Sequence, residues 1–302
     1  MVIVRNMLYA FCGILIFFTP TQPLGGQEAH DVWQDQYIVP DAKGAFLDAP
    51  YIATEYRVVE AMLKPLELRS GDIIYDLGCG DGRIVIEAVK KFGVRGVGID
   101  IDPRRIVESK ANAIAARVSD RTVFLQKDLF ESDIREATAV AIFLFPEMNQ
   151  KLIPKFYNEL KPGTRIVSHN FGIGEWRPDQ EIPLRVGIDG FHKVLFWILP
   201  ANVSGAWQGK FKKEDWTLQI TQKFQSIHGR LTRNGKDFSP ISKATIQGEN
   251  ISFSFVQENR KLLLAFEGKV TGHALEGTIK EGGVSRGTWR GTRNPATVSK
   301  IY

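Results

Sequence analysis

The sequence predicts an α/β protein whose mostly parallel sheet is covered by helices, followed by a small all-β unit. Two observations lead to this prediction. Between residues 54 and 199, short apolar runs alternate with segments whose apolar residues recur at helical spacing, the order typical of a parallel sheet covered on both faces. Beyond Pro200 the helical spacing ends, and short alternating segments separated by turn residues take its place.

The first 26 residues have the pattern of an export signal. Arg5 gives a positive start, residues 7–18 form a 12-residue apolar core, and small residues lead to an expected cleavage point after Gly26. Twelve residues are too few to cross a bilayer, which needs about 20. We therefore expect localisation in the periplasm or cell envelope, and a cytoplasmic location if the signal is not used. An uncleaved anchor and a buried N-terminal helix are the alternatives.

A polar linker over residues 27–48 precedes the elements of the α/β unit, expected at 49–202. Thr54 is expected to cap the first helix, and Asp102, directly before Pro103, a later one. The expected helices cover residues 55–66, 84–92, 103–114 and 148–160. The seven expected strands cover residues 72–78, 93–102, 121–128, 137–146, 164–170, 181–186 and 191–199, the last two as an antiparallel hairpin.

The second unit, residues 203–302, is expected to be a small up-and-down barrel or a sandwich. Gly205-Ala-Trp207-Gln-Gly209 resembles Gly287-Thr-Trp289-Arg-Gly291, so the first and last strands would pair if the sheet closes on itself. Trp207, Trp216 and Trp289 are expected to be core residues rather than ligand contacts. The eight expected strands are 206–211, 216–221, 226–232, 243–248, 251–257, 261–268, 274–280 and 286–291.

Charge is unevenly distributed between the two units. Residues 203–302 hold 16 Lys and Arg against 8 Asp and Glu, a net +8, whereas the rest holds 23 against 26, a net −3. The positive unit permits an anionic partner, and a solvated positive face without a partner is the alternative. Nothing in the sequence indicates nucleic acid. The five histidines, at 30, 169, 192, 228 and 273, are too widely spread to predict a metal site.

Residues 75–84, YDLGCGDGRI, place three glycines at alternate positions between an expected strand and an expected helix. Such a turn tolerates unusual backbone angles and lets a ligand lie on the main chain. A dinucleotide loop would need a third glycine where Arg83 stands, and a nucleoside triphosphate loop would need Gly-Lys-Ser/Thr. Neither of these two fingerprints is therefore present.

Asp76 followed by Gly78, Gly80 and Gly82 resembles the first motif of class I S-adenosylmethionine-dependent methyltransferases. The resemblance implies a Rossmann-like seven-stranded sheet and S-adenosylmethionine as cofactor. It also implies that Asp100 bonds the ribose hydroxyls and Asp128 the adenine amino group. Three neighbours of these positions belong to the same expected binding set: Cys79, Ile101 and Leu129.

Residues 49–176 resemble, more narrowly, the ATP-synthase c-subunit lysine methyltransferases and their prokaryotic relatives, through APYIATEYRVVEAML, FPEMN and RIVSHNFGIGEW. This resemblance implies that Tyr51 and Thr54 lie near the methionine end of the cofactor. The chain departs from many amino methyltransferases in having Phe145-Pro146-Glu147 where Asn/Asp-Pro-Pro-Tyr/Phe would stand.

Four polar residues are placed to meet a methyl acceptor: Glu147 and Asn149 after the fourth strand, and His169 and Asn170 at the fifth. The catalytic candidates among them are Glu147, Asn149 and His169. Capping or solvating the next helix is the alternative for Glu147 and Asn149, and a hydrogen-bonded core position for His169. The sequence thus predicts methyl transfer to an amine, protein lysine included, or to another nucleophile. The alternative is a non-catalytic S-adenosylmethionine-binding or envelope ligand-binding protein whose function lies in the barrel.

Overall fold

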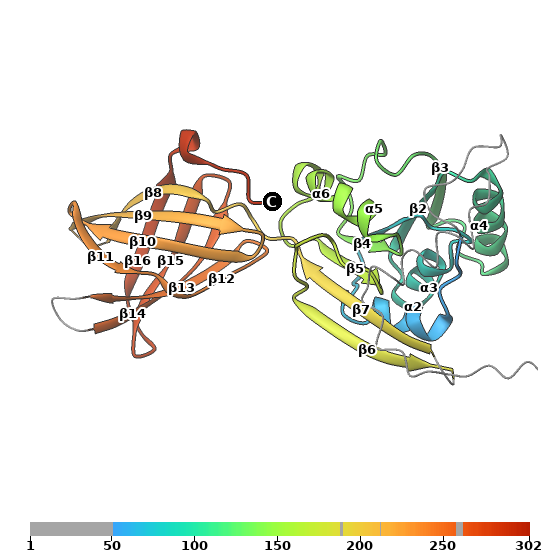
Figure 1. The fold of residues 1–302 in the computed structure, drawn as a ribbon, viewed down its shortest axis with the longest axis horizontal. Helices are drawn as coiled ribbons and strands as arrows, with labels where there is room; N and C mark the ends of the chain where they lie inside the picture. The colour runs from blue at the N-terminus through green and yellow to red at the C-terminus, as the bar shows by residue number, and fades with distance from the viewer. Residues whose placement is uncertain (1–50, 188–189, 212, 258–261) are drawn as a thin grey trace, which may run out of the picture.

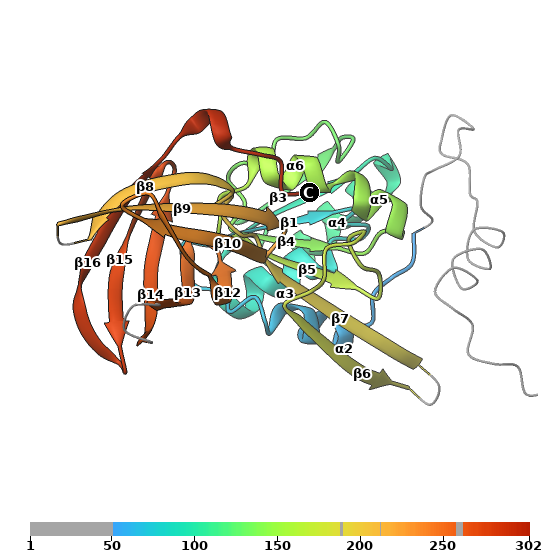
Figure 2. The same cartoon turned by 60° about the vertical axis from the view of Figure 1, so that its left-hand side comes forward.

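The computed structural model describes residues 51–187, 190–211, 213–257 and 262–302. Two sheets lie side by side, the first covered by helices and the second curved into a barrel (Figures 1 and 2). The expected export signal and linker, residues 1–48, lie outside the described residues. Within those ranges, no helix combines the length and the apolar character needed to cross a bilayer.

The first sheet has seven strands in the order β3-β2-β1-β4-β5-β7-β6, which confirms the predicted sheet. Its strands are β1 (Ile73–Leu77), β2 (Arg95–Asp100), β3 (Thr122–Gln126), β4 (Ala139–Ile142), β5 (Arg165–His169), β6 (Gln180–Val186) and β7 (Gly190–Ile198). Strands β1 to β5 run in parallel, and β7 runs antiparallel to both β5 and β6. The carboxyl ends of β1 to β5 therefore meet at one edge, where ligands of such sheets bind.

Helices cover both faces of this sheet. Helices α2 (Tyr56–Leu63), α3 (Arg83–Phe92) and α4 (Pro103–Ala115) pack on one face, and α5 (Pro146–Lys151) and α6 (Ile153–Glu159) on the other. The capping role of Asp102 is confirmed, because its side chain accepts a hydrogen bond from the Arg104 N–H at 2.8 Å. Each helix buries an apolar stripe, so both faces of the sheet are shielded from water.

Two details of the helices were predicted wrongly. Thr54 does not cap α2, since Glu55 holds the N-cap position and the Thr54 side chain contacts His169 instead. The single helix expected over 148–160 is divided into α5 and α6 at Leu152. Pro154 lies in the first turn of α6, and because proline lacks an N–H it cannot continue the hydrogen bonds of the preceding helix.

The second sheet is antiparallel and nearly closed, in the order β11-β10-β9-β8-β16-β15-β14-β13-β12. Its strands are β8 (Gly205–Phe211), β9 (Glu214–Lys223), β10 (Ser226–Arg233), β11 (Lys236–Pro240), β12 (Ser242–Gln247), β13 (Asn250–Gln257), β14 (Leu262–Thr271), β15 (Ala274–Glu281) and β16 (Val284–Arg293). A short 3₁₀ helix, η2 (Pro295–Thr297), follows. The expected pairing of first and last strands is confirmed, with Gly291 opposite Gly209.

The expected eight strands are present, and β11 is a ninth that the sequence did not predict. β11 and β12 hold the two outer positions of the sheet, yet only Ile241 separates them in the chain. The two edges of the sheet are therefore two halves of one bent stretch. Trp207, Trp216 and Trp289 are at most 4% exposed, which confirms that they are core residues.

Aromatic contacts join the two sheets. The Trp176 ring, in the segment after β5, stacks on Phe224 after β9 with ring centroids 5.6 Å apart. Tyr157 of α6 stacks on Tyr302 with centroids 4.8 Å apart. Trp176 and Phe224 are both buried, so the barrel packs against the segment that leaves the carboxyl end of β5.

Candidate functional site

The glycine loop, residues 78–82, connects β1 to α3 at the carboxyl edge of the sheet. Gly78, Gly80 and Gly82 have φ angles of 86°, 52° and 80°, in the left-handed region that favours glycine. A Cβ atom on Gly80 would lie 2.3 Å from a ring carbon of Tyr51. The loop therefore needs glycine at position 80 both for its backbone angle and for the close approach of the aromatic ring.

Asp76 lies in β1 directly below this loop and is 2% exposed. Burial, and then the charges of Asp100 and Asp81, raise the pKa of its carboxyl to about 8. Among the residues that the structure describes, the carboxyl has no hydrogen-bond partner. Ionising a buried carboxyl is costly, and a cationic ligand group beside it would offset that cost.

Asp100, at the end of β2, is fixed by the loop itself. Its Oδ2 accepts a hydrogen bond from Gly80 N–H at 2.8 Å, and its Oδ1 accepts one from Asp102 N–H at 2.9 Å. Each carboxylate oxygen has a second lone pair, so the group can still accept from two neighbouring hydroxyls. Burial is the main cause of its raised pKa.

The remaining expected cofactor residues flank this corner of the sheet. Asp128 follows β3, and its Oδ1 accepts a hydrogen bond from Phe130 N–H at 2.7 Å. Ile101 is 56% exposed beside Asp100, whereas Leu129 is buried. Cys79 points its thiol into the core, so only its main chain can face a ligand.

Arg83 links residues 51–55 to the glycine loop. The Arg83 guanidinium donates to the carbonyl of Thr54 at 2.8 Å and forms an ion pair with Asp81 at 2.6 Å. The Tyr51 ring stacks beneath the guanidinium of Arg105 at 4.1 Å, and burial is the main cause of the raised pKa of its phenol. The sequence used Arg83 only to exclude a dinucleotide loop and missed this contact.

Two of the three catalytic candidates, Glu147 and Asn149, follow β4, and His169 is the last residue of β5. Their environments differ. Glu147 is exposed in the first turn of α5. Asn149 is fully buried, and its amide N–H group donates to the carbonyls of Leu144, Phe171 and Gly172 at 3.1 to 3.4 Å. Asn149 therefore holds the segment after β5 in place.

His169 is the third acceptor candidate and lies in a buried polar cluster. Its Nδ1 is 3.4 Å from the Thr54 hydroxyl and its Nε2 is 2.9 Å from His192 Nδ1. The Phe143 ring packs against it with centroids 4.1 Å apart. Burial, and then His192, lower the pKa of His169 to about 3, so its imidazole is neutral at physiological pH. The sequence missed His192, because only the pairing of β5 with β7 brings it there.

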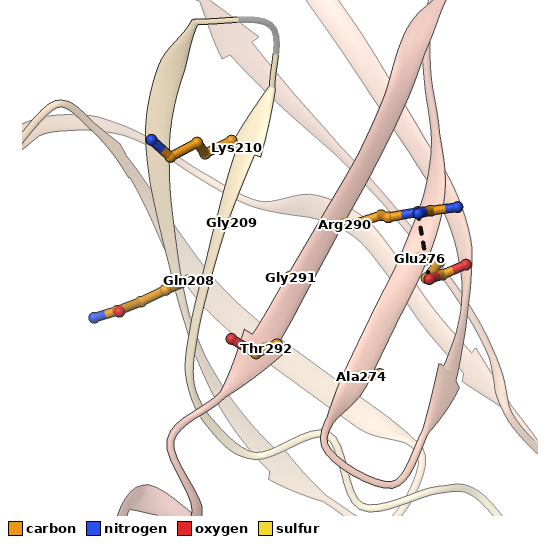
Figure 3. Close-up of a pocket in the computed structure, with 8 residues that line it drawn as sticks. All are labelled: Gln208, Gly209, Lys210, Ala274, Glu276, Arg290, Gly291 and Thr292. Carbon is orange, nitrogen blue, oxygen red and sulfur yellow. Dashed lines mark ion pairs between the residues drawn. The ribbon is translucent and has the colours of Figure 1, made fainter.

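Surface hollows lie both beside the glycine loop and on the barrel. One of about 470 Å³ opens between the start of α2, Arg83 and the end of β6. Another, of about 460 Å³, lies on the outer face of the barrel between β8, β15 and β16, where Arg290 pairs with Glu276 (Figure 3). In the described ranges no group of His, Cys, Asp or Glu side chains could hold a metal ion.

These features fit S-adenosylmethionine. The loop offers main chain without side chains, Asp76 offers a buried carboxyl near the loop, and Asp100 offers lone pairs for two hydroxyls. The exposed apolar side chain of Ile101 suits one face of an adenine base.

Known proteins resemble this chain over its first sheet. Residues 76–180 match the family described as the ANTKMT methyltransferase domain. A protein-lysine N-methyltransferase from Saccharolobus islandicus (strain REY15A) is 46% identical over 151 residues, which are 50% of this chain and 93% of that protein. An adenine nucleotide translocase lysine N-methyltransferase from Mus musculus is 35% identical over 133 residues, 44% of this chain and 57% of that protein. The chain thus spans little more than half of the mouse relative.

A solved structure of an RNA methyltransferase from Salinibacter ruber, in complex with S-adenosyl-L-homocysteine, is 46% identical in sequence. The match covers 49% of this chain and 93% of the Salinibacter ruber chain, and its TM-score is 0.45. The domain match and the Saccharolobus islandicus relative, which is covered almost completely, agree with the strand order and the glycine loop described above. The chain therefore belongs to the ANTKMT family of class I S-adenosylmethionine-dependent methyltransferases.

Proposed function

We propose that this methyltransferase modifies lysine side chains of proteins. The observation that carries the proposal is the 46% identity to a protein-lysine N-methyltransferase over 93% of that protein's length. The mouse relative also bears a lysine N-methyltransferase name. The acceptor side agrees with this choice, since the neutral imidazole of His169 suits a neutral amine in the reacting state.

The cofactor would be held by the corner of the sheet around the glycine loop. When bound, it supplies an electrophilic methyl group on a sulfonium sulfur. The main chain of residues 78–82 would support it, with Asp100 on the ribose and Asp128 on the adenine amino group. Asp76 would accept from the amino group at the methionine end, beside Tyr51 and Thr54. Ile101 and Leu129 would flank the base.

The acceptor residues would act mainly by positioning, because the sulfur leaves as a neutral thioether and needs no acid. Glu147, exposed at the start of α5, would attract the ammonium of an incoming lysine. Asn149 would hold the segment after β5, and His169 would face the amine once it is neutral. A lysine side chain has an ordinary pKa of about 10.4, so it must lose a proton before it can attack.

The test is transfer of a labelled methyl group to a lysine-rich polypeptide, with mass spectrometry to identify the modified residue. A matched polypeptide in which every lysine is arginine serves as control. Label on lysine alone supports the proposal. Label in nucleic acid or in small molecules, with none in protein, contradicts it. Tight cofactor binding without transfer to any acceptor favours the non-catalytic alternative.

We also propose that residues 1–26 direct export, on the basis of the N-terminal pattern. Residues 49–202 and 203–302 would be the two domains, because the architecture changes between β7 and β8. The net charge of +8 on residues 203–302 would serve an anionic partner. Cell fractionation and sequencing of the mature N-terminus test the first point. An intact chain in the cytosol would contradict export.

A further inference from the structure

His169 and His192 belong to a chain of polar groups that starts at the glycine loop. Arg83 donates to the Thr54 carbonyl at 2.8 Å, and the Thr54 hydroxyl lies 3.4 Å from His169 Nδ1. His169 Nε2 lies 2.9 Å from His192 Nδ1. Thr54 and His169 are 4% and 3% exposed, so the middle of this chain is shielded from water.

His169 is suited to pass a proton rather than to hold one. Its pKa is low because it is buried and because His192 is close, so it stays neutral. A neutral imidazole has one N–H donor and one nitrogen acceptor. Since Thr54 contacts one of its ring nitrogens and His192 the other, His169 can accept a proton on one side and release one on the other.

His192 lies at the outer end, near the tip of the β6–β7 hairpin, and is half-buried. Its Nε2 would be 3.1 Å from a Cβ on Gly190, so glycine at that position leaves room beside this nitrogen. The elements packed against β7 are β5, β6 and α2. The charged residues on these elements, at the N-cap of α2 and on β7 itself are Glu55, Arg57, Glu60, Arg165, Glu181, Arg185 and Lys193. Among the described residues, none of these hydrogen-bonds to either imidazole.

We propose that His192 acts on the acceptor amine through His169, as the outer end of a proton path that begins at Thr54. The inference depends on the proposed function, because an ammonium acceptor must lose a proton. The ammonium N–H bond breaks and Thr54 Oγ1 gains that proton. The Thr54 proton moves to His169 Nδ1, and the His169 Nε2 proton moves to His192 Nδ1. His192 then releases its Nε2 proton to water. The amine now has a free lone pair, which forms the new N–C bond as the C–S bond breaks.

The test compares kcat of the full chain at pH 7.5 and pH 10 for His192→Phe and His192→Gln, with a lysine polypeptide as acceptor. At pH 7.5 both variants are expected to lose about 100-fold in kcat, the usual contribution of a proton-transfer group. At pH 10 the loss should shrink to about threefold, because solvent then deprotonates much of the lysine, whose pKa is about 10.4. Affinity for S-adenosylmethionine, measured by calorimetry, should not change.

His192→Gln keeps a hydrogen-bonding group beside His169 but cannot carry a proton through its side chain. His228→Gln, on the exposed face of β10, is the matched control and should leave kcat unchanged at both pH values. A loss in His192→Phe that is equal at both pH values and recovered by His192→Gln would show a structural role and overturn the path. Wild-type kcat in both variants would also overturn it. Failure of the proposed function looks different, because the wild-type protein would then methylate no lysine.

Discussion

Replacing Asp76 with asparagine is expected to stabilise the ligand-free protein and to weaken cofactor binding. The carboxyl of Asp76 has a pKa of about 8 in the folded state, against an ordinary value of 3.8. Between these values the unfolded chain is deprotonated while the folded chain keeps its proton. Stability is therefore full below about pH 4 and is lost as the pH rises towards 8.

The size of the effect follows from that difference. pH 7 lies about 3 units above the ordinary pKa of 3.8. At 1.36 kcal/mol per unit, keeping this carboxyl buried lowers the free energy of unfolding at pH 7 by up to about 4 kcal/mol. Asparagine removes this cost but brings an amide whose donors lack partners, which takes back roughly 1–3 kcal/mol. We expect a net gain of about 2 kcal/mol in the free energy of unfolding at pH 7, and no gain at pH 4.

Urea unfolding of the ligand-free wild-type and Asp76→Asn proteins, at intervals from pH 4 to pH 8, measures this difference. Asp120→Asn, an exposed change, is the control and should show no pH-dependent difference. Calorimetry should show S-adenosylmethionine binding weakened roughly 10- to 150-fold, the loss of a hydrogen bond to a charged group. A variant that is less stable at pH 7, or one whose gain persists at pH 4, would refute the reasoning.

Three further substitutions test the glycine loop, the contacts of Arg83 beside it, and the packing between the two sheets. Gly80→Ala is expected to weaken S-adenosylmethionine binding at least tenfold by calorimetry, because alanine at φ 52° costs about 1–2 kcal/mol and displaces the Tyr51 ring; wild-type affinity would contradict this. Arg83→Gln leaves the Asp81 carboxylate without its ion pair and should lower the free energy of unfolding by about 3 kcal/mol, so an unchanged urea midpoint would count against the contact. Phe224→Ala empties a site that is 6% exposed, and a loss of about 3–5 kcal/mol should appear as a lower Tm; a Tm equal to the wild type would mean that the junction does not stabilise the fold.

The sequence was sufficient for features that depend on local pattern. Apolar runs identified all seven strands of the first sheet, and alternate glycines identified the loop between β1 and α3. β11 was missed because residues 236–240, KDFSP, lack an apolar alternation and end in proline, and their pairing with β10 supplies the missing stability.

The contacts of the site depend on features that sequence spacing does not contain. Thr54 and His169 are 115 residues apart, and His192 reaches His169 only because β7 runs antiparallel beside β5. Arg83 follows the glycine loop directly, but its hydrogen bond to the Thr54 carbonyl depends on the path of the segment before α2. Register and chain path decide such contacts, whereas residue type decides only which chemistry is available.

The bent stretch formed by β11 and β12 determines how the barrel can meet other molecules. Both outer strands of the barrel are short, five residues in β11 and six in β12, so an extended peptide finds little to pair with. In the other sheet, β6 is an outer strand and carries Pro183, which has no N–H to donate. Strand addition is thus disfavoured at these edges, and a partner that binds there would be recognised through side chains.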